Sequence, residues 1–232
     1  MTPSDLDNLK RAAALAAVDY VKAGMVVGLG TGSTAKHLVM ALGEQVRKGL
    51  FIRGVCTSED TAALAAQYGI VLLDREPSWA IDVAIDGADQ VDASFNLIKG
   101  GGGALLKEKI VAASAKQFVV VIDHTKRVSV LGGSFPLPVE VVRFGWGSTA
   151  RHIEALTQGR AVLRERGGAP FCTESDNLIV DVHLATIDRP EELEIALNRI
   201  PGVVETGLFV GRTDVLIVGT PHGPETHTVK RT

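Results

Sequence analysis

Four charged side chains with catalytic potential lie between residues 86 and 108 of this chain. Asp86 and Asp89 stand three residues apart, Lys99 follows them, and Glu108 comes after a run of four glycines. Carboxylates can carry protons in a reaction, and a lysine or a set of backbone N–H groups can stabilise negative charge on oxygen. The stretch therefore suits a small anionic substrate whose reaction moves protons and builds an oxyanion.

A strand and a helix must hold these residues in place. Residues 81 to 85 form a short apolar, β-branched run typical of a buried strand. Asp86 and Asp89 would then follow its carboxyl end, where open α/β sheets bind ligands. Helical spacing resumes after the glycines, from about Ala104. A helix that begins there could turn Glu108 back toward the ligand, although Glu108 taken alone reads as an ordinary exposed helix acid.

The run Gly100 to Gly103 is the most specific short signal in the chain. Glycine loses more conformational entropy on folding than any other residue, so a merely connecting loop would rarely use four of them. Their benefit would be backbone N–H groups that approach a ligand without interference from side chains. Lys99, immediately before them, would place a positive charge beside developing negative charge.

A second glycine-rich turn, residues 28 to 35, joins an apolar run to a helical one. Free N–H groups at the start of a helix attract anions, and Thr31, Ser33 and Thr34 add hydroxyl donors. The turn also fits the weak Gly-x-Gly-x-x-Ala fingerprint of dinucleotide sites, with Glu59 as the acid for the ribose. A tight turn without a ligand is the structural alternative. The hydroxyl groups favour a small phosphate or sugar over a dinucleotide.

The pattern of metal-ligating residue types predicts no metal site. Asp86, Asp89 and Asp92 lack the alternating spacing of a calcium loop and have no histidine partner, so Asp92 reads as a solvated turn residue. Cys56 and Cys172 lie far apart in the sequence. They favour buried thiols rather than a disulfide or a zinc site.

The composition is that of a globular protein and excludes several function classes. The 232 residues are 46% hydrophobic and 22% charged, with a net charge of −3. This balance leaves no basic footprint for nucleic acid and no cationic face for a membrane. No uncharged apolar run approaches the ~20 residues of a membrane span. The N-terminal stretch carries Asp5 and Asp7 where a signal peptide would carry positive charge, so we expect a cytoplasmic protein.

The order of strand and helix patterns predicts an α/β fold. Strands and helices alternate through the first half of the chain, as in a Rossmann-like, mostly parallel sheet with helices on both faces. Residues 132–138 are rich in glycine and proline and mark a boundary. Beyond it the patterns run β-α-β-β-α-β, a ferredoxin-like α+β unit. We therefore predict a main catalytic domain of residues 1–131 and 209–232, with a small domain, residues 132–208, inserted in it.

Three element boundaries are specific enough to test. Ser4 is expected to cap a first helix that runs to about Lys22, and a second helix is expected to begin at about Ala35. Residues 222–232 are expected to form a polar tail or a sheet edge.

The motifs together, in this order, resemble those of A-type ribose-5-phosphate isomerases, and the resemblance covers essentially the whole chain. The motifs that carry it are Gly28-Leu29-Gly30-Thr31-Gly32-Ser33-Thr34, Thr57-Ser58-x-x-Thr61, Asp86-Gly87-Ala88-Asp89, Lys99-Gly100-Gly101-Gly102-Gly103 with Glu108-Lys109, Phe135-Pro136-Leu137-Pro138-Val139-Glu140-Val141 and Ile200-Pro201-Gly202-Val203-Val204-x-x-Gly207-Leu208-Phe209. Two departures are Gln90, where an acid is frequent, and the turn at 174–177, where Asp-Asn-Gly is more usual.

The resemblance implies a cofactor-free aldose–ketose isomerase of the non-oxidative pentose phosphate pathway, which interconverts ribose 5-phosphate and ribulose 5-phosphate through an enediolate. It implies Glu108 as the base between C2 and C1, and Asp86 and Asp89 as the acids that handle the sugar hydroxyls and ring opening. Such enzymes are usually homodimers or homotetramers. The residues implied to stabilise the enediolate or bind the substrate are Lys99, Gly100, Gly101, Gly102, Thr31, Gly32, Ser33, Thr34, Gly87, Ala88 and Lys126.

Three other functions stay open from the residues alone. A nicotinamide dehydrogenase would use the turn at 28–35 for a dinucleotide. A non-catalytic sugar-phosphate sensor would keep Thr31 to Thr34 but would not need Glu108. A sugar-phosphate deaminase or lactonase on the same scaffold is the nearest enzymatic alternative, and substrate profiling separates it from an isomerase.

Overall fold

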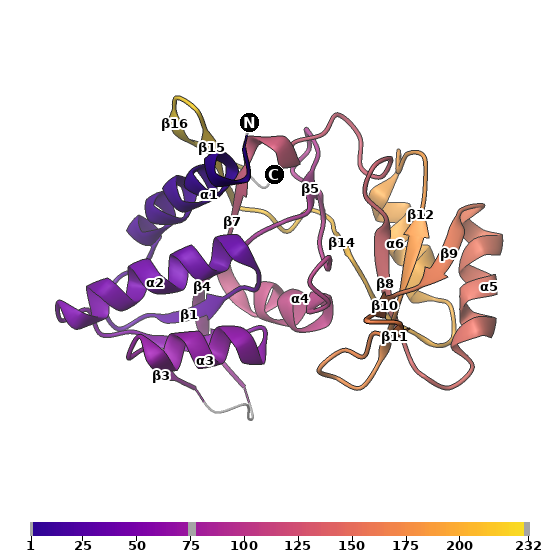
Figure 1. Ribbon diagram of the computed structural model, residues 1–232, viewed down its shortest axis with the longest axis horizontal. Helices are drawn as coiled ribbons and strands as arrows, with labels where there is room; N and C mark the ends of the chain where they lie inside the picture. Colours follow the sequence, from indigo (N-terminus) through magenta and orange to yellow (C-terminus); the bar gives the residue numbers. More distant parts are fainter. Residues whose placement is uncertain (1, 74–77, 230–232) are drawn as a thin grey trace. The chain divides into compact units, whose positions relative to one another are not determined.

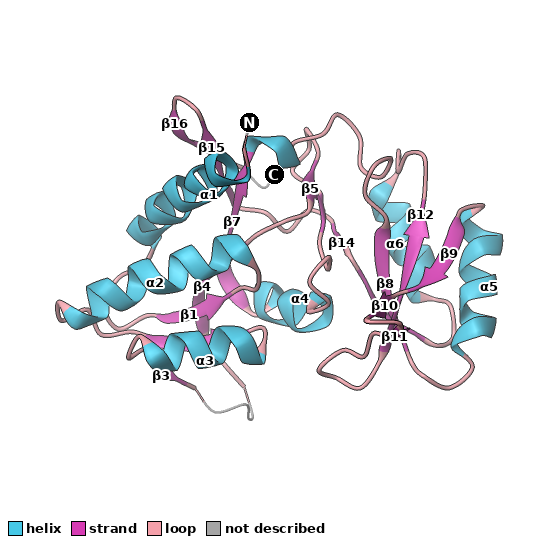
Figure 2. Ribbon diagram, viewed as in Figure 1, coloured by secondary structure: helices cyan, strands magenta, loops and turns pink. Residues whose placement is uncertain are grey.

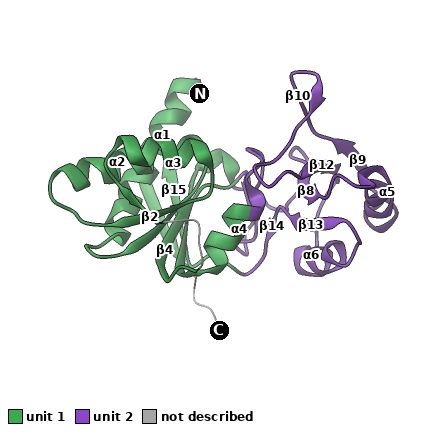
Figure 3. Ribbon diagram, turned by 90° about the horizontal axis from the view of Figure 1, so that it is seen from below, with its two compact units in different colours: residues 1–88, 107–126, 212–232 green, residues 89–106, 127–211 purple. Residues whose placement is uncertain are grey.

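The structure is a computed structural model that describes residues 2–73 and 78–229. The chain divides into two compact units, coloured separately in Figure 3. Unit 1 comprises residues 1–88, 107–126 and 212–232, and unit 2 comprises residues 89–106 and 127–211. The elements of both units are labelled in Figure 1 and coloured by type in Figure 2.

Unit 1 is built on a seven-stranded sheet in the order β16-β15-β7-β4-β1-β2-β3. All neighbouring strands are parallel except β16, which pairs antiparallel with β15 and forms one edge. The expected polar tail therefore provides an edge strand, while residues 230–232 lie outside the described residues. The strands are β1 (Val26–Leu29), β2 (Arg53–Cys56), β3 (Val71–Leu72), β4 (Ile81–Asp86), β7 (Ala115–Asp123), β15 (Val215–Thr220) and β16 (Gly223–Thr228).

Helices cover both faces of this sheet because its central strands are apolar on both sides. Val27 and Leu29 of β1 join the core that α1 and α2 supply with buried alanines and leucines. Gly28, between them, faces the other way, where a Cβ atom would lie 2.5 Å from Val111 of α4. The helices are α1 (Pro3–Ala17), α2 (Ser33–Arg47), α3 (Glu59–Gln67) and α4 (Leu105–Ala113), with the 3-10 turns η1 (Val18–Tyr20) and η2 (His124–Lys126).

Two predicted helix starts are wrong. Helix α1 is capped by Thr2 rather than Ser4, because Thr2 and Asp5 bond reciprocally to each other's backbone N–H groups in a capping box. Helix α2 begins at Ser33 rather than about Ala35, because Gly32 takes a positive φ of 101° that turns the chain directly into the helix.

Unit 2 contains the predicted ferredoxin-like arrangement. Its four-stranded antiparallel sheet has the order β13-β8-β12-β9, and the buried residues of α5 and α6 complete its core. The elements are β8 (Leu137–Val141), α5 (Trp146–Thr157), β9 (Arg160–Leu163), β12 (Leu178–His183), α6 (Pro190–Asn198) and β13 (Val203–Thr206), with the short strands β5 (Gln90–Val91), β6 (Leu97–Ile98), β10 (Glu165–Arg166), β11 (Ala169–Pro170) and β14 (Leu208–Phe209).

Unit 2 is larger than the predicted insertion of residues 132–208, because it also contains residues 89–106, 127–131 and 209–211. Strands β5 and β6 form a small sheet with β14, so the chain after Asp89 pairs with the end of unit 2. The side-chain amide of Gln90 adds two bonds of 2.8 Å, donating to the carbonyl of Gly132 and accepting from its N–H group. A carboxylate could accept but not donate there, which gives a reason for glutamine at this position.

No helix of the described residues is long and apolar enough to cross a membrane.

Candidate active site

Asp86 ends strand β4 and is held in a fixed orientation. Its Oδ1 atom accepts hydrogen bonds from the backbone N–H groups of Thr31, at 3.0 Å, and Gly87, at 2.7 Å. The side chain is only 4% exposed. A Cβ atom at Gly30 would lie 2.0 Å from the same oxygen, so only glycine lets the end of β1 approach this carboxylate. The ends of the adjacent parallel strands β1 and β4 thus fix one acidic group, and Asp86 lies at the carboxyl end of a strand, as predicted.

Glu108 lies in the first turn of α4, where a negative charge interacts favourably with the helix dipole. Its exposed fraction is 5%, so the reading as an ordinary exposed helix acid is wrong. Glu108 and Asp86 line one small internal space, together with Gly28, Gly30 and other residues of the sheet and of α4. Two largely buried carboxylates therefore line one small space, an arrangement that proton-transfer chemistry can use.

The start of α2 has the properties of an anion site. Within the described residues, no side chain caps its first turn and no acid lies in that turn. Its first N–H groups are therefore available to an anion, and Gly32 and Ser33 are exposed. The Thr31 hydroxyl lies 2.6 Å from the hydroxyl of Thr57, which in turn donates to the carbonyl of Leu29. Reasoning from residue types missed Thr57, which entered only as part of a family motif.

The predicted site residues Gly87, Ala88 and Lys126 also belong to unit 1. Gly87 and Ala88 follow Asp86 directly and are half-buried. Lys126 is half-buried in the 3-10 turn η2, which follows β7, the parallel neighbour of β4. Buried Asp123 holds this turn by accepting bonds from the N–H and hydroxyl groups of Thr125. Lys126 and Asp86 thus both lie at the carboxyl-terminal edge of the sheet.

The remaining predicted residues, Asp89, Lys99 and the glycine loop, belong to unit 2. The Asp89 Oδ2 atom accepts a hydrogen bond of 2.8 Å from the N–H group of Gly101. Lys99 is 3% exposed, and its Nζ atom lies 5.5 Å from the centre of the Phe209 ring, a cation–π distance. The backbone N–H group of Lys99 donates to the carbonyl of Gly207. Unit 2 therefore presents one carboxylate, one ammonium group and exposed glycine amides close together in the chain.

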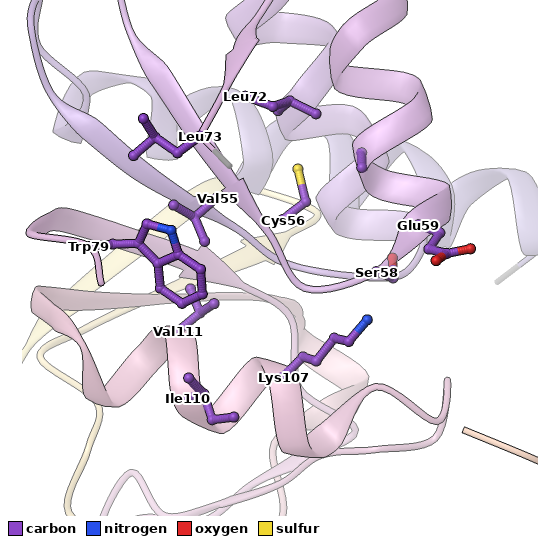
Figure 4. Close-up of a pocket in the computed structure, with 11 residues that line it drawn as sticks. Val55, Cys56, Ser58, Glu59, Leu72, Leu73, Trp79, Lys107, Ile110 and Val111 are labelled. Carbon is purple, nitrogen blue, oxygen red and sulfur yellow. The ribbon is translucent and has the colours of Figure 1, made fainter. Parts of the chain in front are cut away.

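A larger hollow in unit 1 contains none of the residues that the family resemblance implies for the site (Figure 4). Glu59, the acid of the alternative dinucleotide site, does line it. Its volume is about 240 Å³, and apolar side chains such as Trp79 and Ile110 make most of its wall. Lys107 extends toward Ser58 at its rim. Cys56 also lines it, and burial raises the pKa of that thiol to about 12. Such a wall offers few hydrogen-bond partners for sugar hydroxyls or a phosphate. In this respect the hollow differs from the space lined by Asp86 and Glu108.

Among residues 2–73 and 78–229, no group of three or more His, Cys, Asp or Glu side chains is placed to hold a metal ion.

Comparisons with known proteins identify the family of this site. The pattern of ribose 5-phosphate isomerase A (phosphoriboisomerase A) matches residues 53–223. A protein named ribose-5-phosphate isomerase A from Gluconobacter oxydans is 49% identical over 227 residues, which cover 97% of this chain and 98% of that protein. This chain belongs to the ribose 5-phosphate isomerase A family.

Solved structures of the family share the whole fold. Ribose 5-phosphate isomerase A from Methanocaldococcus jannaschii superposes with a TM-score of 0.91 at 42% identity, covering 96% of this chain and 99% of that one. A D-ribose-5-phosphate isomerase in complex with phospho-erythronic acid superposes with a TM-score of 0.93 at 38% identity, covering 97% of this chain and 99% of that one. The resemblance drawn from the sequence motifs is therefore confirmed, and so is the predicted α/β fold.

Proposed function

We propose that this ribose 5-phosphate isomerase A family member interconverts ribose 5-phosphate and ribulose 5-phosphate through an enediolate. The observation that carries the proposal is the pair of buried carboxylates, Asp86 and Glu108, around one small space at the ends of β1 and β4. Moving a proton between neighbouring carbons requires a base shielded from water and a second group that handles the oxygen protons. Family membership supports the same reaction.

Glu108 acts in this proposal as the base that carries the proton between C2 and C1. Asp86 and Asp89 handle the sugar hydroxyls, ring opening and the proton that moves between O1 and O2. Both are held by backbone N–H groups, Asp86 by those of Thr31 and Gly87 and Asp89 by that of Gly101. These bonds keep each carboxylate in one orientation before the substrate arrives.

The oxyanion of the enediolate is stabilised in this proposal by Lys99 and by backbone N–H groups of the glycine loop, residues 100 to 102. Residues 31 to 34 bind the substrate at the open start of α2, where N–H groups and hydroxyls suit a phosphate. Lys126 closes the ligand site, and Gly87 and Ala88 line it. The enzyme is proposed to work without a cofactor or a metal, and as a homodimer or homotetramer, which light scattering on the purified protein measures.

The test is the isosteric substitution Glu108→Gln, assayed with ribose 5-phosphate in the absence of added coenzyme and with EDTA present. Glutamine keeps the shape of the side chain but cannot accept the proton from carbon, so turnover should nearly vanish while ribose 5-phosphate still binds. Glu44→Gln, the same chemical change on the exposed face of α2, is the matched control and should keep wild-type rates. A Glu108→Gln enzyme with wild-type turnover would show that the base is assigned to the wrong residue.

Lys99→Ala separates transition-state from ground-state binding. Removal of one preorganised charge beside an oxyanion typically costs about 10²–10³ in kcat. We therefore expect a large fall in kcat with a smaller change in KM. A rise in KM alone would instead assign Lys99 to ground-state binding of the substrate.

Substrate profiling addresses the remaining alternatives. Pentose and hexose phosphates, an amino-sugar phosphate and a sugar-phosphate lactone are offered in turn, and binding of nicotinamide coenzymes is followed by thermal shift. The family match does not favour the deaminase, lactonase, dehydrogenase or sensor readings, so only the pentose phosphate pair should turn over.

A further inference from the structure

The glycine loop is contacted from the sheet of unit 2 by an arginine that residue patterns did not single out. Arg164 lies between β9 and β10, and its side chain is 13% exposed. Its Nη1 atom donates to the carbonyl oxygens of Gly100, at 2.7 Å, and of Gly101, at 3.2 Å. One guanidinium nitrogen therefore holds two consecutive peptide units of the loop.

Arg164 is itself fixed by a neighbouring strand. Its Nε atom donates to Oδ2 of Asp181 on β12 at 2.8 Å, and its Nη2 atom donates to Oδ1 of the same carboxylate. Asp181 is only 17% exposed, so this two-point ion pair is largely shielded from water. The backbone N–H group of Arg164 donates to the carbonyl of Ile179 on the same strand. A planar guanidinium held at two points has little freedom to rotate, unlike a lysine ammonium.

The direction of the two carbonyls determines the direction of the amides that follow them. In a planar trans peptide, C=O and the next N–H point to opposite sides. Because the carbonyl of Gly100 faces Arg164, the N–H group of Gly101 faces away from it, and this N–H donates to Asp89 at 2.8 Å. The carbonyl of Gly101 also faces Arg164, so the N–H group of Gly102 faces away from the guanidinium as well.

Glycine makes such restraints important, and the carbonyl of Gly100 also accepts a hydrogen bond of 3.0 Å from the N–H group of Gly103. A glycine peptide rotates with little steric resistance, and Gly100 already occupies a positive φ of 101°. A rotated peptide would present a carbonyl oxygen, with its partial negative charge, where an N–H donor is needed beside a developing oxyanion. The contact with Arg164 stabilises the orientation in which the two carbonyls face the guanidinium and the following N–H groups face away from it.

We propose that Arg164 is a positioning residue for the isomerase reaction. It holds the carbonyls of Gly100 and Gly101 so that the N–H groups of Gly101 and Gly102 face Asp89 and the enediolate. Asp181 holds Arg164 in turn. This assigns a role in catalysis to the sheet of unit 2, and it rests on the proposed isomerase function.

The test compares Arg164→Lys and Arg164→Ala with Arg160→Ala, an exposed arginine on β9 that serves as the matched control. We expect Arg164→Ala to lower kcat about 100-fold, the typical effect of a displacement of about 1 Å in a catalytic group, with a change in KM of less than about threefold. Added guanidinium ion should restore part of the lost rate in Arg164→Ala. Lysine keeps the positive charge but lacks the planar guanidinium that bonds Asp181 and the loop at the same time. The kcat of Arg164→Lys should therefore stay well below that of wild type. The control should keep wild-type kcat.

Amide NMR supplies a readout that does not depend on turnover. The N–H resonances of Gly101 and Gly102 should shift in Arg164→Lys while those of the main sheet of unit 1 stay in place. If Arg164→Ala does not fold, Arg164→Lys and Asp181→Asn decide through the same measurements. Wild-type kcat in a folded Arg164→Lys enzyme with unmoved glycine resonances overturns the positioning role. If the wild-type protein has no isomerase activity, the proposed function is refuted instead. The effect of Arg164 on the N–H groups of Gly101 and Gly102 is still measured by NMR, which does not depend on activity.

Discussion

Gly30→Ala tests how strictly the position of Asp86 determines turnover. The added methyl group would lie 2.0 Å from Oδ1 of Asp86 and 2.1 Å from its Cγ atom, whereas ordinary contacts begin at 3.4 Å. The substitution adds no charge and removes no functional group. Its whole effect must therefore come from displacement of the carboxylate or of the strand end that carries Gly30.

The distance that the Asp86 carboxylate must move determines the expected fall in kcat. To regain an ordinary contact, the carboxylate must move by about 1.4 Å from its present 2.0 Å separation, which also breaks its bonds to the N–H groups of Thr31 and Gly87. A misplacement of about 1 Å in a catalytic group costs about 10²-fold in rate. We therefore expect kcat for ribose 5-phosphate to fall about 100-fold, and overpacking to lower the free energy of unfolding by about 1–3 kcal/mol.

The assay measures kcat and KM at saturating and limiting ribose 5-phosphate, together with thermal unfolding. Gly147→Ala is the control, because a Cβ atom at Gly147 meets no atom within 4 Å. Gly147 lies in the first turn of α5, where alanine should leave kcat unchanged and raise stability by roughly 0.5–1 kcal/mol. A folded Gly30→Ala enzyme with the kcat of wild type would refute the reasoning, because Asp86 would then tolerate a displacement larger than catalysis should permit.

Two further predictions concern ionisation away from the active site. The Lys116 ammonium and the N–H group of Val26 lower the pKa of Asp82 below its ordinary value of 3.8, so its charged form stabilises the folded state above that pH. Asp82→Asn should therefore unfold at a lower temperature than wild type at pH 7. This difference in unfolding temperature should shrink as the pH falls below 3.8 and through the lowered pKa of the folded state. A difference that grows on acidification would contradict the assignment. Burial raises the pKa of Cys56 to about 12, whereas Cys172 is exposed, so a thiol reagent at pH 8 should label Cys172 quickly and Cys56 much more slowly. Mass spectrometry of the labelled peptides measures the order, and faster labelling of Cys56 would contradict this prediction.

The sequence was sufficient for those parts of the fold that depend on periodicity. Short, mostly apolar runs such as 81–85 predicted buried parallel strands, and the β-α-β-β-α-β order predicted the sheet of unit 2. The membership of residues 89–106 was not predictable, because β5 and β6 have two residues each and β14, which pairs with β6, lies about a hundred residues away in the chain. Strands this short give no periodic signal, so only the tertiary pairing shows where they belong.

The placement of two predicted residues followed from residue type and local context. Asp86 after a strand and Gly32 before a helix were identifiable from position alone. The burial of Glu108 was not, since helical spacing does not tell which face of α4 is covered. Arg164 was missed because its contact with Asp181 depends on how β9 and β12 pair, and antiparallel register is invisible in the chain order.

Helix α4 crosses the border between the two units, with Leu105 and Leu106 on one side and Lys107 onward on the other. The chain crosses that border at three other places as well, after residues 88, 126 and 211. No single cut can therefore release either unit as an unbroken polypeptide. A cut at any of these four crossings would separate Glu108 from part of unit 1, so we expect the two units to melt together rather than one after the other.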